Sequence, residues 1–378
     1  MTDAYTLKCV TTLTSLEKLE DIWQSLYESN DTLTHFQTYE WNAGMIKGHA
    51  YGGKYFVYLL YKNDELILIA PMQKCKNGLF SDLTFLGHDT HADYLDFIYK
   101  NIEASDLKYL VRALTSAHKM SLLRMSFING NSRTVSLLKQ VRMEMRHEIK
   151  KCVHIKIADS EDAYINTIGK STKREIRSGI AKLSRNFNVE YKMYGAGERL
   201  DETLVDRLLE IYVARNEEKS VRFRFDGEYM GFLRDYICNS GNAFAAVLYL
   251  DNDIAAFNLG FKQDRTMIVL LVAMDSTYKS YNAGNLLLYH TIGSLIKLKR
   301  SGASDVGTYD LTRGEELYKL KYGGAIHYNH SFEYAYFRCA RRIGMKLARV
   351  YHRFAAPHFP RSSSNQKVAP AQRSLSVI

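Results

Sequence analysis

The 378-residue chain has little of what marks secreted, membrane-spanning or metal-binding proteins. Five cysteines are scattered along it without the spacing of a metal clamp, which favours reduced thiols in a cytoplasm and no bound metal. No run approaches the roughly 18 to 20 apolar residues that a membrane-spanning helix needs. The first ten residues, MTDAYTLKCV, lack the basic start and apolar core of a secretory signal. We therefore expect a cytoplasmic protein, and its composition, 46% hydrophobic and 24% charged, is that of a globular one.

Proline is scarce, and three of the four prolines lie beyond residue 356, near the serines at 362–364. This composition predicts a disordered tail over residues 357–378.

Acidic residues are fewer than basic ones: the chain has 41 aspartates and glutamates and 51 lysines and arginines, which gives a net charge of +10. The basic residues gather in two clusters, at 170–185 and 338–353. Each cluster suits an anionic partner, such as a phosphorylated cosubstrate, a phospholipid surface or nucleic acid, or it is a solvated helix face. No recognised nucleic-acid-binding motif accompanies the charge, so nucleic acid is the least expected partner.

The order of predicted elements occurs twice. Turn residues between β-rich runs predict three antiparallel strands, then a helix, a strand, a helix and a strand. In the first half these elements are expected at 55–61, 66–72, 79–86, 107–118, 122–127, 134–142 and 152–157. In the second half they are expected at 243–250, 254–261, 266–273, 284–299, 304–309, a helix ending at 322, and 325–332. Helices at 15–28, capped by Ser15, and at 38–48 precede the first copy, and helices at 204–219 and 226–239 precede the second.

The segment from Tyr309 to Gly324 concentrates reactive side chains. Asp310, Arg313, Tyr318 and Lys319 lie within ten residues, directly after the predicted strand. Charged groups of both signs at the carboxyl end of a strand usually face a cleft, because ligands bind there in α/β proteins.

Three local patterns resemble those of GNAT-type acyltransferases, in the CelD/BcsL-like group that is related to FemAB proteins. They are the basic segment 171–177, the loop and helix start at 278–287, and the strand end at 309–319. Weaker similarities occur at 36–41 and 85–87, and together the patterns span most of residues 10–330. The resemblance implies an α+β (mixed α/β) fold with two tandem GNAT-like domains, each a mostly antiparallel central sheet flanked by helices.

The implied organisation has five parts. They are a first GNAT-like domain at 1–160, a basic bridging segment at 161–190, a second, catalytic domain on the acyl-CoA side at 191–333, a basic helix at 334–356, and the tail. The basic helix at 334–356 either contacts the inner membrane peripherally or docks on the second domain with its arginines in water.

The resemblance implies acetyl-CoA or another acyl-CoA as cosubstrate. The loop at 278–284 enters a helix whose free N–H groups suit phosphate oxygens, although it has one glycine where the usual signature has two or three. An ordinary glycine before a helix is the alternative interpretation. The residues implied on the donor side are Val272, Ala273, Met274, Lys279, Tyr281, Ala283, Gly284 and Asn285.

The implied chemistry divides between donor and acceptor. Tyr318, a phenol with an ordinary pKa near 10, would protonate the departing thiolate, or it is a packed aromatic. Asp310 would act as base or orient the acceptor, or it only fixes Arg313. Arg313 and Lys319 would bind the acceptor, or Lys319 lies on the surface.

The first half would contribute Asp93 and Tyr94 to the acceptor pocket. The histidines and aspartates between residues 88 and 96 are irregularly spaced, so we expect them to shape this pocket rather than hold a metal.

The resulting hypothesis is an acyl-CoA-dependent N- or O-acyltransferase that acts on a sugar or another cell-envelope or exopolysaccharide precursor. Acetyl is the acyl group that we expect it to transfer. One alternative is a FemAB-type aminoacyl transferase that uses aminoacyl-tRNA. Another is a non-catalytic accessory module of polysaccharide synthesis.

Overall fold

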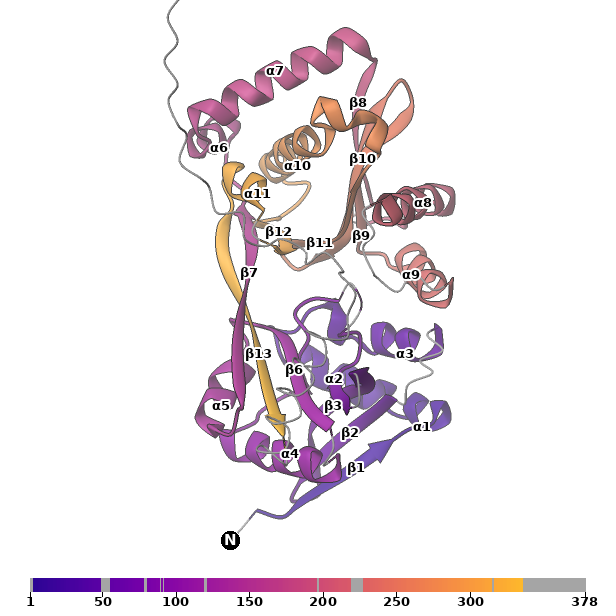
Figure 1. The fold of residues 1–378 in the computed structure, drawn as a ribbon, viewed down its shortest axis with the longest axis vertical. Coiled ribbons are helices and arrows are strands. Elements are labelled where there is room, and N and C mark those ends of the chain that lie inside the picture. Colours follow the sequence, from indigo (N-terminus) through magenta and orange to yellow (C-terminus); the bar gives the residue numbers. More distant parts are fainter. Residues whose placement is uncertain are drawn as a thin grey trace, which may run out of the picture. The chain divides into compact units, whose positions relative to one another are not determined.

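The computed structural model (Figure 1) describes residues 3–48, 55–77, 80–88, 90, 92–118, 121–195, 197–218, 227–314 and 316–335. The chain divides into two compact units, and the described residues all belong to the first, Met1–Tyr336. Most of the predicted basic helix at 334–356 and the whole of the predicted tail lie outside the described residues. Residues 334 and 335 belong to a strand.

The first half builds one copy of the repeated order. Its elements are β1 (Tyr5–Val10), α1 (Leu13–Glu17), α2 (Glu20–Glu28), the 3-10 helix η1 (His35–Gln37), α3 (Tyr39–Gly48), β2 (Tyr55–Lys62), β3 (Glu65–Asn77), β4 (Phe80–Phe85), β5 (Ile98–Tyr99), α4 (Ala104–Ala117), β6 (Ser121–Asn129), α5 (Arg133–Val141) and β7 (Arg146–Lys156).

The second half begins with two helices and then repeats the order. Its elements are α6 (Glu161–Thr167), α7 (Lys170–Asn186), β8 (Val189–Gly195), α8 (Glu202–Glu218), α9 (Gly227–Asn239), β9 (Ala243–Leu250), β10 (Asp253–Gln263), β11 (Thr266–Met274), η2 (Ser276–Tyr281), α10 (Ala283–Arg300), β12 (Thr308–Arg313), α11 (Leu317–Lys321) and β13 (Ala325–Ala335).

The two hairpin turns follow from the sequence directly. Asn63 and Asp64 have φ of 50° and 65°, and Asp251 and Asn252 have φ of 51° and 75°. Two consecutive residues with positive φ make the turn that matches the twist of antiparallel strands, and Asn and Asp tolerate this conformation best. The predicted hairpins at these positions are confirmed.

Two strands were missed, and two predictions about the elements were wrong. The edge strands β1 and β8 were not predicted, although they pair along β2 and β9. The helix expected over 15–28 is two helices, and Thr12 rather than Ser15 caps the first by accepting a hydrogen bond from the Ser15 N–H. The strand expected at 304–309 begins only at Thr308, where its pairing with Lys156 of β7 starts, so Asp310 and Arg313 lie inside β12.

All the strands except β5 follow one path, in the order β1-β2-β3-β4-β6-β13-β7-β12-β11-β10-β9-β8. The pairs β4–β6 and β11–β12 are parallel, and the others are antiparallel. The predicted mixed α/β fold, with a mostly antiparallel sheet flanked by helices, is confirmed.

The last strand of each half crosses into the other half. β7 pairs with β12 of the second half, and β13 pairs with β6 of the first half (Figure 1). β7 and β13 also pair with each other over nine residues, from Ala325↔His154 to Glu333↔Arg146. Each half of the sheet is therefore completed by a strand that belongs in sequence to the other half.

The basic segment predicted to bridge the halves is helix α7. Its buried residues are Thr172, Ile176 and Leu183, and its lysines and arginines are exposed or half-buried. Gly179 brings α7 close to α10, because a Cβ at that position would lie 3.0 Å from a methyl group of Leu286. The apolar face of α7 thus packs on α10, and its basic face stays in water.

None of the described helices is long and apolar enough to cross a membrane. The four cysteines among the described residues, Cys9, Cys75, Cys152 and Cys238, form no disulfide bonds.

Candidate active site

The parallel strands β11 and β12 separate after a short paired stretch. Their pairing runs only from Thr266↔Thr308 to Ile268↔Asp310, while β11 continues to Met274 and β12 to Arg313. A cavity of about 230 Å³, here called the strand-gap cavity, lies along the separated ends. It is lined by Val272, Ala273 and Met274 of β11, Asn282, Gly284, Asn285 and Leu288 at the start of α10, and Arg215, Asn258, Leu311 and Tyr318.

The start of α10 offers polar backbone to this cavity. The first N–H groups of any helix lack partners within the helix, and they carry its positive dipole end. A Cβ added at Gly284 would meet no atom within 4 Å, so the glycine leaves the cavity side of the helix open rather than serving close packing. A ligand could therefore approach the backbone closely at this point.

Five of the eight predicted donor-side residues line the strand-gap cavity, and three do not. Ala283 is fully buried under the helix start. Tyr281 packs edge-on against Phe187, and the Lys182 ammonium lies 4.5 Å from its ring centre. Lys279 is exposed on η2. Tyr281 therefore lies beside α7, and neither residue lines the cavity.

The Tyr318 side chain reaches the strand-gap cavity from α11. Burial, and to a lesser extent the charge of nearby Glu316, raises the pKa of its phenol to about 12. Among the described residues, no group hydrogen-bonds its hydroxyl. The phenol is therefore a protonated, uncommitted donor at neutral pH.

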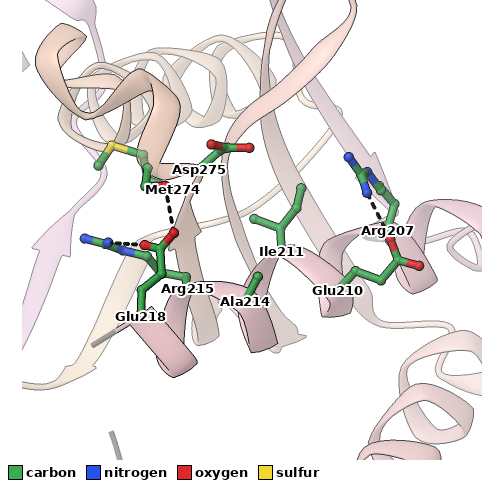
Figure 2. Close-up of a pocket in the computed structure, with 9 residues that line it drawn as sticks. Arg207, Glu210, Ile211, Ala214, Arg215, Glu218, Met274 and Asp275 are labelled. Atoms are coloured by element: carbon green, nitrogen blue, oxygen red, sulfur yellow. Dashed lines mark hydrogen bonds and ion pairs between the residues drawn. The ribbon is translucent and has the colours of Figure 1, made fainter. Parts of the chain in front are cut away.

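A second pocket, next to the mouth of the strand-gap cavity, exposes Arg215 (Figure 2). The Arg215 guanidinium donates to the Glu218 carboxylate over 2.9 Å, and Ser276 donates to the same carboxylate over 2.8 Å. Arg215 lines both cavities, so its positive charge stands where the two meet. Sequence analysis did not single out Arg215, because a lone arginine on a helix carries no signal.

Asp310 points to the opposite face of β12 from the strand-gap cavity. Successive side chains of a strand point to opposite faces, so Tyr309 and Leu311 face the core of the second half and Asp310 faces away from it. Asp310 is only 2% exposed. It lies opposite Ile268 in the last paired position, at the point where β11 and β12 separate.

The Asp310 carboxylate is held by groups from a loop of the first half, from β12 itself and from β7. The Tyr94 hydroxyl donates to Oδ1 over 2.8 Å, and the Thr312 N–H donates to the same oxygen over 2.7 Å. His154 Nε2 of β7 lies 3.2 Å from Oδ2, and the His154 ring stacks on His327 of β13 at 3.8 Å. Thr312 has a φ of 53°, a strained conformation that lets its N–H turn back onto Asp310.

Arg313 pairs with Asp93 rather than with Asp310, so the interpretation that Asp310 only fixes Arg313 was wrong. The guanidinium also stacks on the Phe127 ring, 3.7 Å from its centre. Burial raises the pKa of Asp93 to about 6, although the Arg313 charge beside it acts in the opposite direction. The Arg313 guanidinium is thus held in an ion pair with the buried Asp93 carboxylate.

Lys319 is buried rather than on the surface. Its ammonium donates to the backbone carbonyls of Leu311 and Arg313 over 3.0 and 2.9 Å, and it lies 3.0 Å from the Glu316 carboxylate. Its contacts within the chain fix the end of β12 and the start of α11.

Asp310 lines a third pocket of about 420 Å³, here called the Asp310 pocket. Residues from both halves line it: Asp31, Thr32, Leu33, Thr34, Tyr94, Asn129, Asn131, His154, Gln263, Asp264, Thr266, Ile268, Thr308, Asp310 and His327. The predicted residue Tyr94 is in this pocket, and Asp93 lies behind it. His154 and His327 were not predicted, because only the strand exchange brings them beside Asp310.

Among the described residues, no group of three histidine, cysteine, aspartate or glutamate side chains could hold a metal ion. Asp89 and His91 lie outside the described residues.

Residues 170–320 match the acetyltransferase (GNAT) domain family. The matched range contains the strand-gap cavity, Asp310 and Tyr318, but not Tyr94, His154 or His327. No curated protein matches the chain in sequence.

Among solved structures, the chain is similar to FemX, with a TM-score of 0.55 and 11% identity over 91% of this chain and 99% of that one. It is also similar to the C-terminal domain of a putative lysylphosphatidylglycerol synthetase from Agrobacterium fabrum (TM-score 0.53, 11% identity, 89% and 97% covered). L-PGS from Bacillus licheniformis is a third (TM-score 0.50, 11% identity, 87% and 96% covered). Because the sequence identities are only 11%, these similarities show a shared fold and nothing further. The chain thus has a GNAT-like mixed α/β fold, and its residues 170–320 match the acetyltransferase domain.

Proposed function

We propose that this protein is an acyltransferase that takes its acyl group from a coenzyme A thioester, with acetyl-CoA as the first candidate. The carrying observation is the strand-gap cavity, which joins a helix start, an uncommitted phenol and an arginine in the domain that matches the GNAT family. Coenzyme A carries phosphates, for which a helix start and an arginine are suitable partners.

The residues present fit this donor. The open surface at Gly284 lets phosphate oxygens approach the backbone of α10, and Arg215, whose guanidinium is paired with Glu218, lines the same cavity. The separated end of β11 leaves Val272, Ala273 and Met274 without a strand partner on the β12 side, so their backbone can hydrogen-bond a ligand. A thioester supplies an activated carbonyl carbon and a thiolate leaving group.

We propose that the acceptor enters from the opposite face of the sheet, through the Asp310 pocket. His154 would take the proton of the acceptor, and Asp310 would orient the imidazole and stabilise the resulting charge. Tyr318 would give a proton to the departing thiolate from the other face. Donor and acceptor would then meet where β11 and β12 separate.

The proposed acceptor is a sugar or another cell-envelope or exopolysaccharide precursor, in line with the resemblance to the CelD/BcsL-like group. The many hydroxyl and amide side chains of the Asp310 pocket support an acceptor molecule that is polar and uncharged or weakly charged.

Calorimetric titration of the full chain with acetyl-CoA tests the donor. We expect saturable binding at submillimolar concentrations, and binding of charged tRNA without binding of acetyl-CoA would favour the aminoacyl-transfer alternative. Thiol release in the presence of acceptor distinguishes an enzyme from an accessory module.

The Tyr318→Phe variant tests the proton donor. General acids contribute roughly 10²- to 10⁴-fold to rate, so turnover should fall by about that factor while acetyl-CoA affinity changes little. Tyr328→Phe, at a tyrosine that is 48% exposed on β13, is the matched control. Equal turnover in the two variants would remove Tyr318 from the mechanism.

A further inference from the structure

The cavities on the two faces of β12 differ in charge. Asp31, Asp264 and Asp310 line the Asp310 pocket, and among the described residues no lysine or arginine does. Arg215 lines the strand-gap cavity, where no described acidic side chain does. The neighbouring pocket of Figure 2 carries both signs, because Glu210, Glu218 and Asp275 line it together with Arg207 and Arg215. The chain has 51 lysines and arginines, and none of those that the structure describes lines the Asp310 pocket.

The acidic side chains of the Asp310 pocket are not neutralised by lysines or arginines. Asp31 and Asp264 are exposed at its rim, and no described lysine or arginine forms an ion pair with either. Asp310, deeper in the pocket, is bound by a tyrosine, a histidine and a backbone N–H rather than by a guanidinium. Arg313, the nearest arginine in sequence, is committed to Asp93. A ligand in this pocket therefore meets a negative potential.

Apart from Leu33, Ile268 and the rings of Tyr94, His154 and His327, the rest of the pocket is lined by uncharged polar side chains. Its remaining hydroxyl and amide side chains are those of Thr32, Thr34, Asn129, Asn131, Gln263, Thr266 and Thr308. Such groups both donate and accept hydrogen bonds, which suits a molecule with several hydroxyl groups.

Resting on the proposed function, we propose that the acceptor is a free amino sugar without phosphate or carboxylate groups. Its ammonium would be attracted by the three aspartates, and its hydroxyls would meet the threonines and amides. Phosphorylated sugars and nucleotide sugars are repelled from the pocket by the same aspartates.

The transfer balances without a further reactant. The bound ammonium gives one proton to His154, which makes the nitrogen a nucleophile. The nitrogen attacks the thioester carbonyl, so that a C–N bond forms and the C–S bond breaks. The thiolate takes a proton from Tyr318, and the amide nitrogen releases its second proton to solvent. Tyr318 then regains a proton from solvent and His154 returns its proton to solvent, so that one proton is released overall. The products are an N-acyl sugar and free coenzyme A.

Binding of three matched sugars to the full-length protein tests this charge preference. Glucosamine, glucose and glucosamine 6-phosphate differ in net charge on one scaffold, and the ring protons of His154 and His327 report binding by NMR. An exposed charge pair is worth up to about 1 kcal/mol, which corresponds to about fivefold in affinity. At low salt and pH 7 we expect glucosamine to bind about fivefold more tightly than glucose and more than fivefold more tightly than the phosphate. Equal affinities, the reverse order or no binding of glucosamine would overturn the proposal.

Variants of the two rim aspartates, Asp31 and Asp264, then test whether these residues cause the preference for glucosamine over glucose. The double variant Asp31→Asn/Asp264→Asn should lose most of the preference for glucosamine over glucose. Glu210→Gln, which removes an exposed carboxylate that pairs with Arg207 outside this pocket, should keep it. An unchanged preference in the double variant would contradict the inference.

The two proposals fail separately. If the protein prefers glucosamine but does not bind acetyl-CoA, the proposed donor is refuted. The proposed preference of the Asp310 pocket for an amino sugar is then unaffected. A protein that binds acetyl-CoA and favours glucosamine 6-phosphate would refute the proposed phosphate-free acceptor and would not affect the proposed donor.

Discussion

The Tyr94 hydroxyl donates a hydrogen bond to the Asp310 carboxylate over 2.8 Å and joins residues 216 positions apart. Tyr94 belongs to the first half and Asp310 to the second, and both side chains line one pocket. The hydroxyl also lies 3.2 Å from His154 Nε2. The proposed proton-accepting pair thus depends on a residue from each half of the chain.

Replacing Tyr94 with phenylalanine should lower turnover without changing acetyl-CoA affinity, because the Asp310 carboxylate loses a partner that orients it. Hydrogen bonds to charged groups contribute about 1.5 to 3 kcal/mol, so the free energy of unfolding should fall by about that amount. Tyr5→Phe is a matched control, because Tyr5 donates to the Asp106 carboxylate over 2.6 Å far from the site. Urea unfolding and steady-state kinetics would show similar stability losses and a rate loss in Tyr94→Phe alone.

Gly284→Ala should stabilise the protein and weaken donor binding. A Cβ there meets no protein atom within 4 Å, and alanine favours helix over glycine by about 1 kcal/mol at most. The same methyl group would occupy the surface on which we place the phosphates. Gly293→Ala, also in α10 with no atom within 4 Å, should raise the unfolding free energy with no effect on acetyl-CoA affinity. Unchanged affinity in Gly284→Ala would argue against a donor at this helix start.

The buried Asp96 should make the protein less stable as pH rises from 4 to 6. Burial raises its pKa from 3.8 to about 6, although the Ser132 hydroxyl and the Phe97 N–H donate to the carboxylate. The folded state therefore binds a proton that the unfolded state has already lost in this range, so the stability from this group is present below pH 4 and is lost by about pH 6. The change is at most about 3 kcal/mol.

Asp96→Asn removes this titration and keeps an oxygen for Ser132. Urea unfolding at pH 4 and pH 7 should therefore show a smaller loss of stability with rising pH in the variant than in the original protein. Identical pH dependences would mean that Asp96 does not titrate as a buried carboxyl group.

A fragment of residues 1–160, the predicted first domain, should not fold alone. It lacks β13, which pairs with both β6 and β7, so both strands would expose unpaired edges. Co-expression with residues 161–378 should give a soluble complex by size-exclusion chromatography, whereas the fragment alone should aggregate. A monomeric fragment with cooperative unfolding would show that the exchange is dispensable.

The sequence by itself determined the order of elements and the location of the reactive segment. Alternating apolar runs and turns such as Asn63-Asp64 encode hairpins locally, because a turn needs only its own residues. The charged residues from Asp310 to Lys319 were recognisable for the same reason: they are contiguous. Their individual roles were not, since Arg313 and Lys319 are committed to partners that the sequence does not place beside them.

Only the tertiary structure decided which strands pair across the middle of the sheet. Strand pairing depends on backbone hydrogen bonds that any extended segment can make, so residue type does not reveal that β7 joins β12 or that β13 joins β6. That exchange brings His154 and His327 to Asp310 and forms the pocket between residues of the two halves. The separation of β11 from β12, on which the strand-gap cavity depends, is likewise a property of how the strands pack and not of either strand alone.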